Sequence, residues 1–226
     1  MQAAVSQRAS ILLVDNDEVS ARFLERWLTR EGHAVTPVNS ASAAIEATRI
    51  GRPDLILLDL VVEGAGFTLC RQLKEDPSTR LVPVVIVTSE SDRADRLRAL
   101  DAGADDFLIK PFDPAELRAR IRSLVRLKRY TDELESAEAI ILGLGATIEA
   151  RDPCTRGHCQ RLAAYATMLG ERLALDAADL SALQRGGFLH DIGKIAVPDA
   201  VLLKHGQLDP LETRVMASIP KRATNF

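Results

Sequence analysis

Cysteine and aromatic residues are scarce in this sequence, and it has no long apolar run. Only three cysteines occur among 226 residues, Cys70, Cys154 and Cys159, and an odd number does not suit a closed disulfide framework. No apolar stretch reaches about 18 residues, the length that a membrane-spanning helix needs, and no apolar signal run opens the chain. We therefore expect a cytoplasmic protein with reduced thiols and no membrane partner.

An excess of positive charge is also missing. The formal net charge is -3, so the sequence offers no basic footprint for DNA or for an anionic membrane surface. What is present is a globular composition, with 46% hydrophobic and 27% charged residues. A chain of this length and composition can bury the cores of two modest domains.

The first half alternates short apolar runs with amphipathic stretches, a rhythm typical of parallel strands joined by crossover helices. The predicted strands are 11–14, 34–37, 55–58, 84–87 and 106–109. The predicted helices are 19–31, 41–50, 68–74, 93–102 and one that begins at Pro114, with Asp113 as its N-cap. This pattern predicts an α/β doubly wound, five-stranded parallel sheet.

Polar residues follow most of these strands. They are Asp15, Asn16 and Asp17 after the first, Asp59 after the third, Thr88 and Ser89 after the fourth, and Lys110 after the fifth. In a doubly wound sheet the ligand site lies beyond the carboxyl ends of the strands. Carboxylates, a hydroxyl and a lysine at one sheet edge suit a divalent cation and a phosphoryl group.

With the motifs "ILLVDND", "LILLDL", "VVIVTSE" and "FLIKPF" in this order, residues 9–128 resemble the flavodoxin-like receiver domain of two-component response regulators. The resemblance implies that a histidine kinase phosphorylates Asp59. It implies Mg²⁺ at Asp15, Asn16, Asp59 and the Val61 carbonyl, switch roles for Thr88 and Phe107, a phosphate contact for Lys110 and a cis bond before Pro111.

Two features depart from that family. Asn16 stands where a second acid is usual, so cation affinity falls unless Asp17 substitutes, and the loop "LVVEGAGF" after Asp59 lacks the usual proline. The plainer alternative is that these carboxylates only cap helices, with Asp17 as the strongest N-cap candidate.

Residues 129–150 are interpreted as a helical signalling linker. Apolar residues recur at steps of three and four, as in a coiled coil, and we expect this seam to form a homodimer. The seam consists of Leu134, Ala137, Ile141, Leu144 and Ile148. The alternative is a single helix that packs on its own domain, which Gly143 and Gly145 favour because glycine weakens a helix interior.

Residues 151–226 show helical patterns only, at 161–173 and 179–189. The motifs "ARDPCTRGHCQRLAAYA", "LHDIGKIAVPDAVLLK" and "LDPLETRVM" resemble the front part of an HD-GYP domain, a metal-dependent family that opens cyclic di-GMP. The resemblance makes His158, His190 and Asp191 metal ligands and Lys194 a phosphate contact. An isolated His-Asp pair would otherwise be interpreted as a capped or salt-bridged helix end, and Gly193 is expected to end the helix and keep the site open.

The later part of the HD-GYP pattern is missing. Ile219 stands where the family has a histidine, and paired histidines, a Gly-Tyr-Pro loop and a final aspartate do not follow. His205 lies in a loop where the family carries no ligand, and His33 lies in the receiver. Cys154 and Cys159 flank His158 and are read as packing residues, with binding of a softer metal as the alternative.

We therefore predict a phosphorylation-dependent response regulator with a truncated, inactive HD-GYP output domain that holds at most one Mn, Fe or Zn ion. The alternative is an active cyclic di-GMP phosphodiesterase, with missing ligands supplied by a partner subunit.

Overall fold

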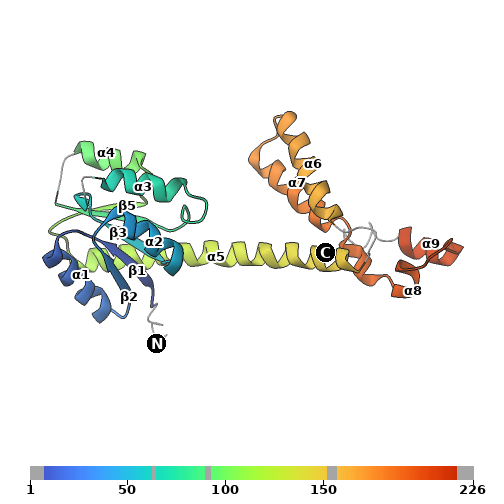
Figure 1. The fold of residues 1–226 in the computed structure, drawn as a ribbon, viewed down its shortest axis with the longest axis horizontal. Coiled ribbons are helices and arrows are strands. Elements are labelled where there is room, and N and C mark those ends of the chain that lie inside the picture. Colours follow the sequence, from blue (N-terminus) through green and yellow to red (C-terminus); the bar gives the residue numbers. More distant parts are fainter. Residues whose placement is uncertain (1–7, 63–64, 90–92, 152–156, 218–226) are drawn as a thin grey trace. The chain divides into compact units, whose positions relative to one another are not determined.

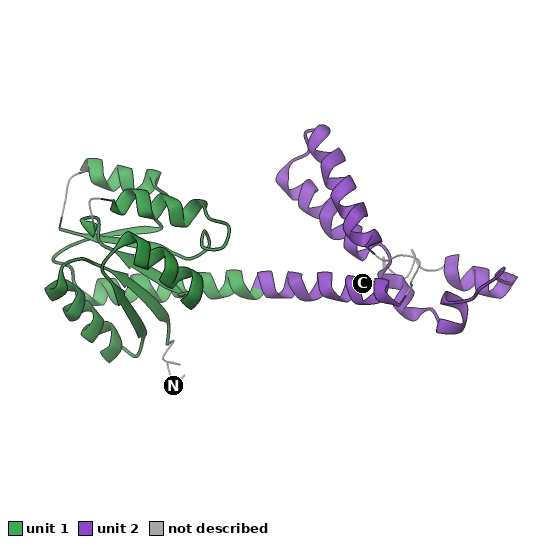
Figure 2. Cartoon of the chain, viewed as in Figure 1, with its two compact units in different colours: residues 1–133 green, residues 134–226 purple. Residues whose placement is uncertain are grey.

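The computed structural model describes residues 8–62, 65–89, 93–151 and 157–217 (Figure 1). The chain divides into two compact units, residues 1–133 and 134–226 (Figure 2). The first unit holds a parallel sheet flanked by helices, and the regular secondary structure in the described part of the second unit is helical.

The sheet of the first unit has five parallel strands in the order β2-β1-β3-β4-β5. The strands are β1 (Ser10–Val14), β2 (Ala34–Val38), β3 (Leu55–Leu58), β4 (Val84–Thr88) and β5 (Asp106–Ile109). All five lie within a residue or two of the predicted ranges. The predicted doubly wound fold is confirmed.

Helices cover both faces of this sheet. They are α1 (Glu18–Arg30), α2 (Ala41–Gly51), α3 (Gly66–Glu75), α4 (Arg93–Asp101) and the first part of α5 (Pro114–Ala150). Helices α2, α3 and α4 contribute to a core cluster with Leu12, Ile56 and Ile86, while α1 and α5 pack on the opposite side with Leu13 and Leu57. The central strands are apolar at successive positions because both faces are buried.

Capping residues begin two of these helices where the sequence places them. Asp17 is the N-cap of α1, and its carboxylate accepts the N–H of Val19. The Asp113 carboxylate accepts the N–H of Ala115 at 2.8 Å, directly before α5 begins at Pro114. These contacts satisfy backbone donors that the first helical turn leaves without a partner.

Helix α5 is continuous over 37 residues and contributes to both units. Leu117 and Ile121 are buried in the sheet unit, and Ile148 is buried in the helical unit. Between them, the seam residues Leu134 and Leu144 are exposed by 72% and 52%. The predicted continuous helix is present, and its seam is open to solvent over most of its length.

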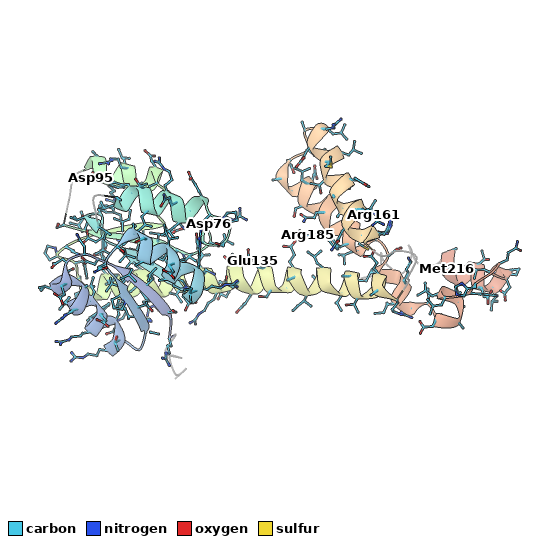
Figure 3. All side chains as sticks on the ribbon, in the orientation of Figure 1. Asp76, Asp95, Glu135, Arg161, Arg185 and Met216 are labelled. Atoms are coloured by element: carbon cyan, nitrogen blue, oxygen red, sulfur yellow. The ribbon has the colours of Figure 1, made fainter. Side chains whose placement is uncertain are left out.

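The helical unit contains α6 (His158–Arg172), α7 (Ala177–Leu189), a 3-10 helix η3 (Ile192–Ala196), α8 (Asp199–Leu202) and α9 (Pro210–Ala217). Helices α6 and α7 lie in close contact at Gly187. A Cβ at this position would lie only 2.6 Å from the Cα of Ala163. Arg185 of α7, labelled in Figure 3, pairs with Glu138 of α5 at 2.8 Å.

Two glycines differ from their sequence-based interpretation. Gly145 was read as a weak point of the α5 interior, but a Cβ there would lie 2.6 Å from the carbonyl oxygen of Phe188, so glycine lets α7 approach. Gly193 was expected to end the helix that carries His190 and Asp191 and to keep the site open. Helix α7 instead ends at Leu189, and Gly193 lies inside η3, because the chain tightens into a 3-10 turn directly after Asp191.

No helix in the described ranges is both long and apolar enough to cross a membrane.

Candidate functional site

The carboxyl ends of β1 and β3 bring two buried carboxylates to one sheet edge. Asp15 follows β1 and is 3% exposed, and Asp59 follows β3 and is 8% exposed. The parallel register that pairs Val14 with Leu58 makes the two strands end side by side. The structure thus places together the carboxylates that the sequence assigns to cation and phosphoryl binding.

Lys110, which follows β5, lies between these carboxylates. Its Nζ donates to Asp59 Oδ2 at 2.6 Å and to Asp15 Oδ2 at 3.0 Å. Burial alone would lower the pKa of Lys110, but the hydrogen bonds and the negative charges of Asp59 and Asp15 outweigh it, so the pKa is raised. Lys110 therefore stays charged throughout the physiological pH range.

The loops after β1 and β3 supply further oxygen atoms. Asp59 Oδ1 accepts the N–H of Val61 at 2.9 Å, and Asn16 Nδ2 lies 3.5 Å from the Val61 carbonyl oxygen. Carboxylates and a backbone carbonyl are the donors that Mg²⁺ prefers. This donor set fits a divalent cation held by Asp15, Asp59 and Val61, with Asn16 beside them.

Asp17 lies at the start of α1, whereas Thr88 and Phe107 are buried in the sheet. The Asp17 carboxylate caps α1, so the structure employs it as the N-cap that the sequence predicts. Thr88 is fully buried at the end of β4, and Phe107 of β5 is 7% exposed. The bond between Lys110 and Pro111 is cis, as expected.

Ser20 was missed by sequence reasoning. Its hydroxyl accepts a hydrogen bond from Lys110 Nζ at 2.7 Å, beside the two carboxylates. The residue lies in the first turns of α1, where a serine looks like an ordinary surface residue. No sequence signal links it to a lysine 90 residues away.

The helical unit gathers a second group of ligand-type side chains. His158 begins α6, and His190 and Asp191 follow α7, so the packing of α6 on α7 brings the three together. Their ligand atoms all lie within 4.8 Å of one another, and the two imidazole rings meet edge to face with centroids 5.1 Å apart. Two imidazoles and a carboxylate suit Zn²⁺, Mn²⁺ or Fe²⁺.

Neighbouring groups orient these ligands. His190 Nδ1 lies 2.9 Å from the carbonyl oxygen of Gly187, which can only accept, so Nδ1 is the donor in this contact and Nε2 faces Asp191 Oδ2 at 3.3 Å. Metal-binding histidines commonly have this support from a backbone carbonyl. Lys194, predicted to contact a phosphate, pairs with Asp191 Oδ2 at 2.7 Å. The geometry thus fits a single metal ion.

Other residues near the sequence motifs lie elsewhere or outside the described part. Cys159 is buried, and burial together with Glu149 raises its pKa to about 11, so its thiol is a poor ligand at neutral pH. His205 is exposed, and it is absent from the cluster found in the described residues. Cys154 and Ile219 lie outside the described residues.

Two more residues near the metal cluster were not anticipated. Glu149 accepts the N–H of His158, and Arg151 contacts the backbone of the segment that follows Asp191. Glu149 lies in the last turn of α5 and Arg151 follows that helix, and neither is among the residues that the motif assigns to the site. Their contacts depend on how separate elements pack together, which no local sequence pattern indicates.

The comparisons with known proteins match both halves of the chain. Residues 11–122 match the response regulator receiver domain family, and residues 144–226 match the HD domain family. A crystal structure from Chloroflexus aurantiacus J-10-fl, of a protein assigned as a response regulator, is 30% identical to this chain with a TM-score of 0.51. It covers 53% of this chain and 99% of that one.

Two curated relatives extend the comparison. The response regulator PleD of Caulobacter vibrioides is 43% identical over 148 residues, which cover 62% of this chain and 33% of PleD. The cyclic di-GMP phosphodiesterase response regulator RpfG of Xanthomonas campestris is 34% identical over 235 aligned residues. That alignment covers 94% of this chain and 62% of RpfG, so the chain spans less than two thirds of either relative. The chain belongs to the response regulator family and carries a receiver domain followed by an HD domain.

Proposed function

We propose that Asp59 accepts a phosphoryl group from a histidine kinase. The observation that carries this proposal is the contact of the Lys110 ammonium with both Asp59 and Asp15 at the sheet edge. Receiver domains usually interact with histidine kinases and generally bind divalent metals, and Asp15, Asn16, Asp59 and the Val61 carbonyl would hold Mg²⁺ here. When bound, the ion offsets the negative charge of the phosphoryl group.

The side chains at this edge have distinct parts in the transfer. An Asp59 carboxylate oxygen attacks phosphorus while the bond from phosphorus to the donor's imidazole nitrogen breaks, and that nitrogen keeps the electron pair and takes up a proton. Lys110 and the Thr88 hydroxyl stabilise the charge on the transferred oxygens. Ser20 holds Lys110 beside the carboxylates.

We further propose the organisation that carries the signal onward. The receiver spans 9–128, a helical linker spans 129–150 and the HD region spans 151–226. The exposed seam of the linker, which includes Leu134, Ile141 and Leu144, pairs with a second copy of the chain.

For the HD region, we propose one metal ion held by His158, His190 and Asp191, with Lys194 beside the site. When bound, the ion polarises a phosphodiester and activates a water molecule. Three side chains supply ligands for one ion, whereas the two-metal chemistry of HD-GYP enzymes needs more. A polypeptide of residues 1–226 is therefore expected to bind metal weakly and to leave cyclic di-GMP intact.

A second candidate function is hydrolysis of cyclic di-GMP. It is favoured by the similarity to RpfG over 94% of this chain, since RpfG is described as a cyclic di-GMP phosphodiesterase. In this case the further metal ligands would come from a partner subunit.

The test of the receiver proposal uses a small phosphodonor such as acetyl phosphate with Mg²⁺. Intact-mass spectrometry is expected to show one added phosphoryl group in the unaltered chain and none in Asp59→Ala. Asp54→Ala is the matched control, because Asp54 precedes β3, at the other end of that strand from Asp59, and its carboxylate accepts the N–H of Ser10. A phosphoryl group that persists in Asp59→Ala contradicts the assignment.

The test of the HD proposal combines metal analysis with product analysis. At most one ion per chain is expected, and His190→Ala is expected to abolish its binding. Incubation of cyclic di-GMP with the Mn²⁺, Fe²⁺ or Zn²⁺ form should give no linear product. Hydrolysis that disappears in Asp191→Ala would establish the second candidate function instead.

A further inference from the structure

The end of α5 contacts both chain segments that carry the three ligand-type residues. Glu149 lies in the last turn of α5, and Arg151 follows directly after this helix. His158 belongs to one segment, and His190 and Asp191 belong to the other. Neither Glu149 nor Arg151 is itself part of the cluster in the described residues.

Glu149 fixes the start of α6. Its Oε1 accepts the backbone N–H of His158 at 2.5 Å and lies 3.4 Å from the N of Cys159. The N-cap of α6 is Gly157, whose φ of 70° is left-handed and which has no side chain to cap the helix. The buried Glu149 carboxylate takes over this task, and its negative charge suits the positive end of the helix.

Arg151 fixes the segment after Asp191. Its guanidinium donates to the Val197 carbonyl at 3.2 Å and to the Asp199 carboxylate at 2.5 Å. The carbonyl oxygens of Lys194 and Ile195, both in η3, lie 3.5 Å from the same group. A planar guanidinium with several donors holds such a turn in one arrangement.

We propose that Glu149 and Arg151 are positioning residues that set the distance between His158 and the His190–Asp191 pair. This inference rests on the metal site of the proposed function. Both contacts start from one short stretch of chain, so displacement of that stretch would change the position of both ligand segments. The end of α5 thereby controls metal affinity without contributing a ligand.

The experiment measures binding of Co²⁺, a spectroscopic substitute for Zn²⁺, by the visible absorption of the full 226-residue chain. Glu149→Ala and Arg151→Ala are expected to weaken binding about tenfold or more, as is usual when a support of a metal ligand is lost. Their absorption bands are also expected to change shape, because the ligand geometry relaxes.

Two conservative variants at Glu149 separate the effect of side-chain length from the effect of charge. Glu149→Gln keeps the length and an oxygen acceptor for the His158 N–H, so it should retain most of the affinity. Glu149→Asp keeps the charge but is one methylene shorter, so it should weaken binding as strongly as Glu149→Ala. These variants also serve if Glu149→Ala fails to fold, and far-UV circular dichroism checks the helical content of each.

Glu138→Gln and Arg185→Ala are the matched controls. They remove another contact of α5 in the same unit, the ion pair at 2.8 Å, and should leave Co²⁺ affinity unchanged. Wild-type affinity and spectrum in Glu149→Asp and Arg151→Ala would overturn the inference while the metal site stands. Equal Co²⁺ binding by the unaltered chain and by His190→Ala would overturn both the metal site and the positioning role.

Discussion

The two clusters of polar side chains in this protein have different kinds of support. Asp15, Asp59 and Lys110 lie at the edge of a sheet whose two faces are each covered by a buried apolar cluster. His158, His190 and Asp191 lie in a helical unit where the described residues include few buried apolar side chains. These are Ile148, Cys159, Ala163 and Val197.

This contrast shows two ways to place reactive groups. In the receiver, the register of parallel strands fixes where each loop begins, so packing of the core positions the site. In the helical unit, individual polar contacts and close glycine approaches perform this task, as at Gly187 and Glu149. We expect the receiver site to tolerate substitutions of its polar surroundings better than the metal cluster does.

The largest effect should come from emptying the receiver core. Leu57→Ala removes a fully buried side chain of β3 and is expected to lower the free energy of unfolding by about 2–5 kcal/mol. Urea unfolding, monitored by the fluorescence of the single tryptophan, Trp27, measures this free energy.

The matched substitution in the helical unit is Leu169→Ala, at a side chain that is 59% exposed. It should change stability by no more than about 0.5 kcal/mol, measured by circular dichroism. A loss as large as that of Leu57→Ala would show that another molecule buries the α6 surface, and the contrast between the units would no longer hold.

The next effect concerns the exposed part of α5. Light scattering at micromolar concentration is expected to report a dimer, and the double variant with Leu134→Lys and Leu144→Lys is expected to be a monomer, because lysine cannot be buried in an apolar seam. Val19→Lys, at an exposed position of α1, is the control and should remain dimeric. A monomeric unaltered chain would refute the pairing.

A smaller effect is expected at the receiver cation site. Asn16→Asp adds a carboxylate beside Asp15 and Asp59 and should tighten Mg²⁺ binding about tenfold, roughly 1.4 kcal/mol. Asp17→Asn should leave binding unchanged, because Asp17 caps α1 and asparagine caps as well. Isothermal titration calorimetry compares the two. Weaker binding in Asp17→Asn would show that Asp17 contributes to the cation site.

The smallest expected effect is a pH dependence of the stability of the receiver. Burial lowers the pKa of His33 from 6.5, and its Nδ1 accepts the N–H of Ala9. The folded state therefore binds fewer protons than the unfolded state, and stability should fall as the pH drops below 6.5, until the lowered pKa is passed. His33→Asn should show a flatter profile between pH 7.5 and pH 5, measured by urea unfolding. If the stability of the unaltered chain and of His33→Asn changed with pH in parallel, His33 would not be the cause of the pH dependence.

The sequence was sufficient to predict the five strands of the parallel sheet and the polar side chains that follow them, because apolar strands and the polar residues after them leave a periodic signal. It also predicted that His158 would lie near His190 and Asp191, through the resemblance to a known family. The boundaries of the central strands were accurate because burial on both faces requires continuous apolar runs.

The supporting contacts could not be predicted in the same way. Ser20 is 90 residues from Lys110 along the chain, and Glu149 accepts the N–H of His158 although the two residues belong to different helices. Gly145 was misread because a glycine that admits a neighbouring helix looks like a glycine that weakens its own helix. Such contacts depend on packing between elements, and a local pattern does not encode it.

The stretch of α5 between its two buried ends has a mechanical consequence. From about residue 126 to residue 147 its side chains are mostly exposed, so tertiary packing within one chain contributes little to keeping it helical. Its stiffness then follows a local helix–coil equilibrium, and Gly143, which no neighbouring element approaches within 4 Å, shifts that equilibrium toward coil. Pairing with another surface would stiffen this segment of α5. In a monomer, the segment would transmit torque between its two ends poorly.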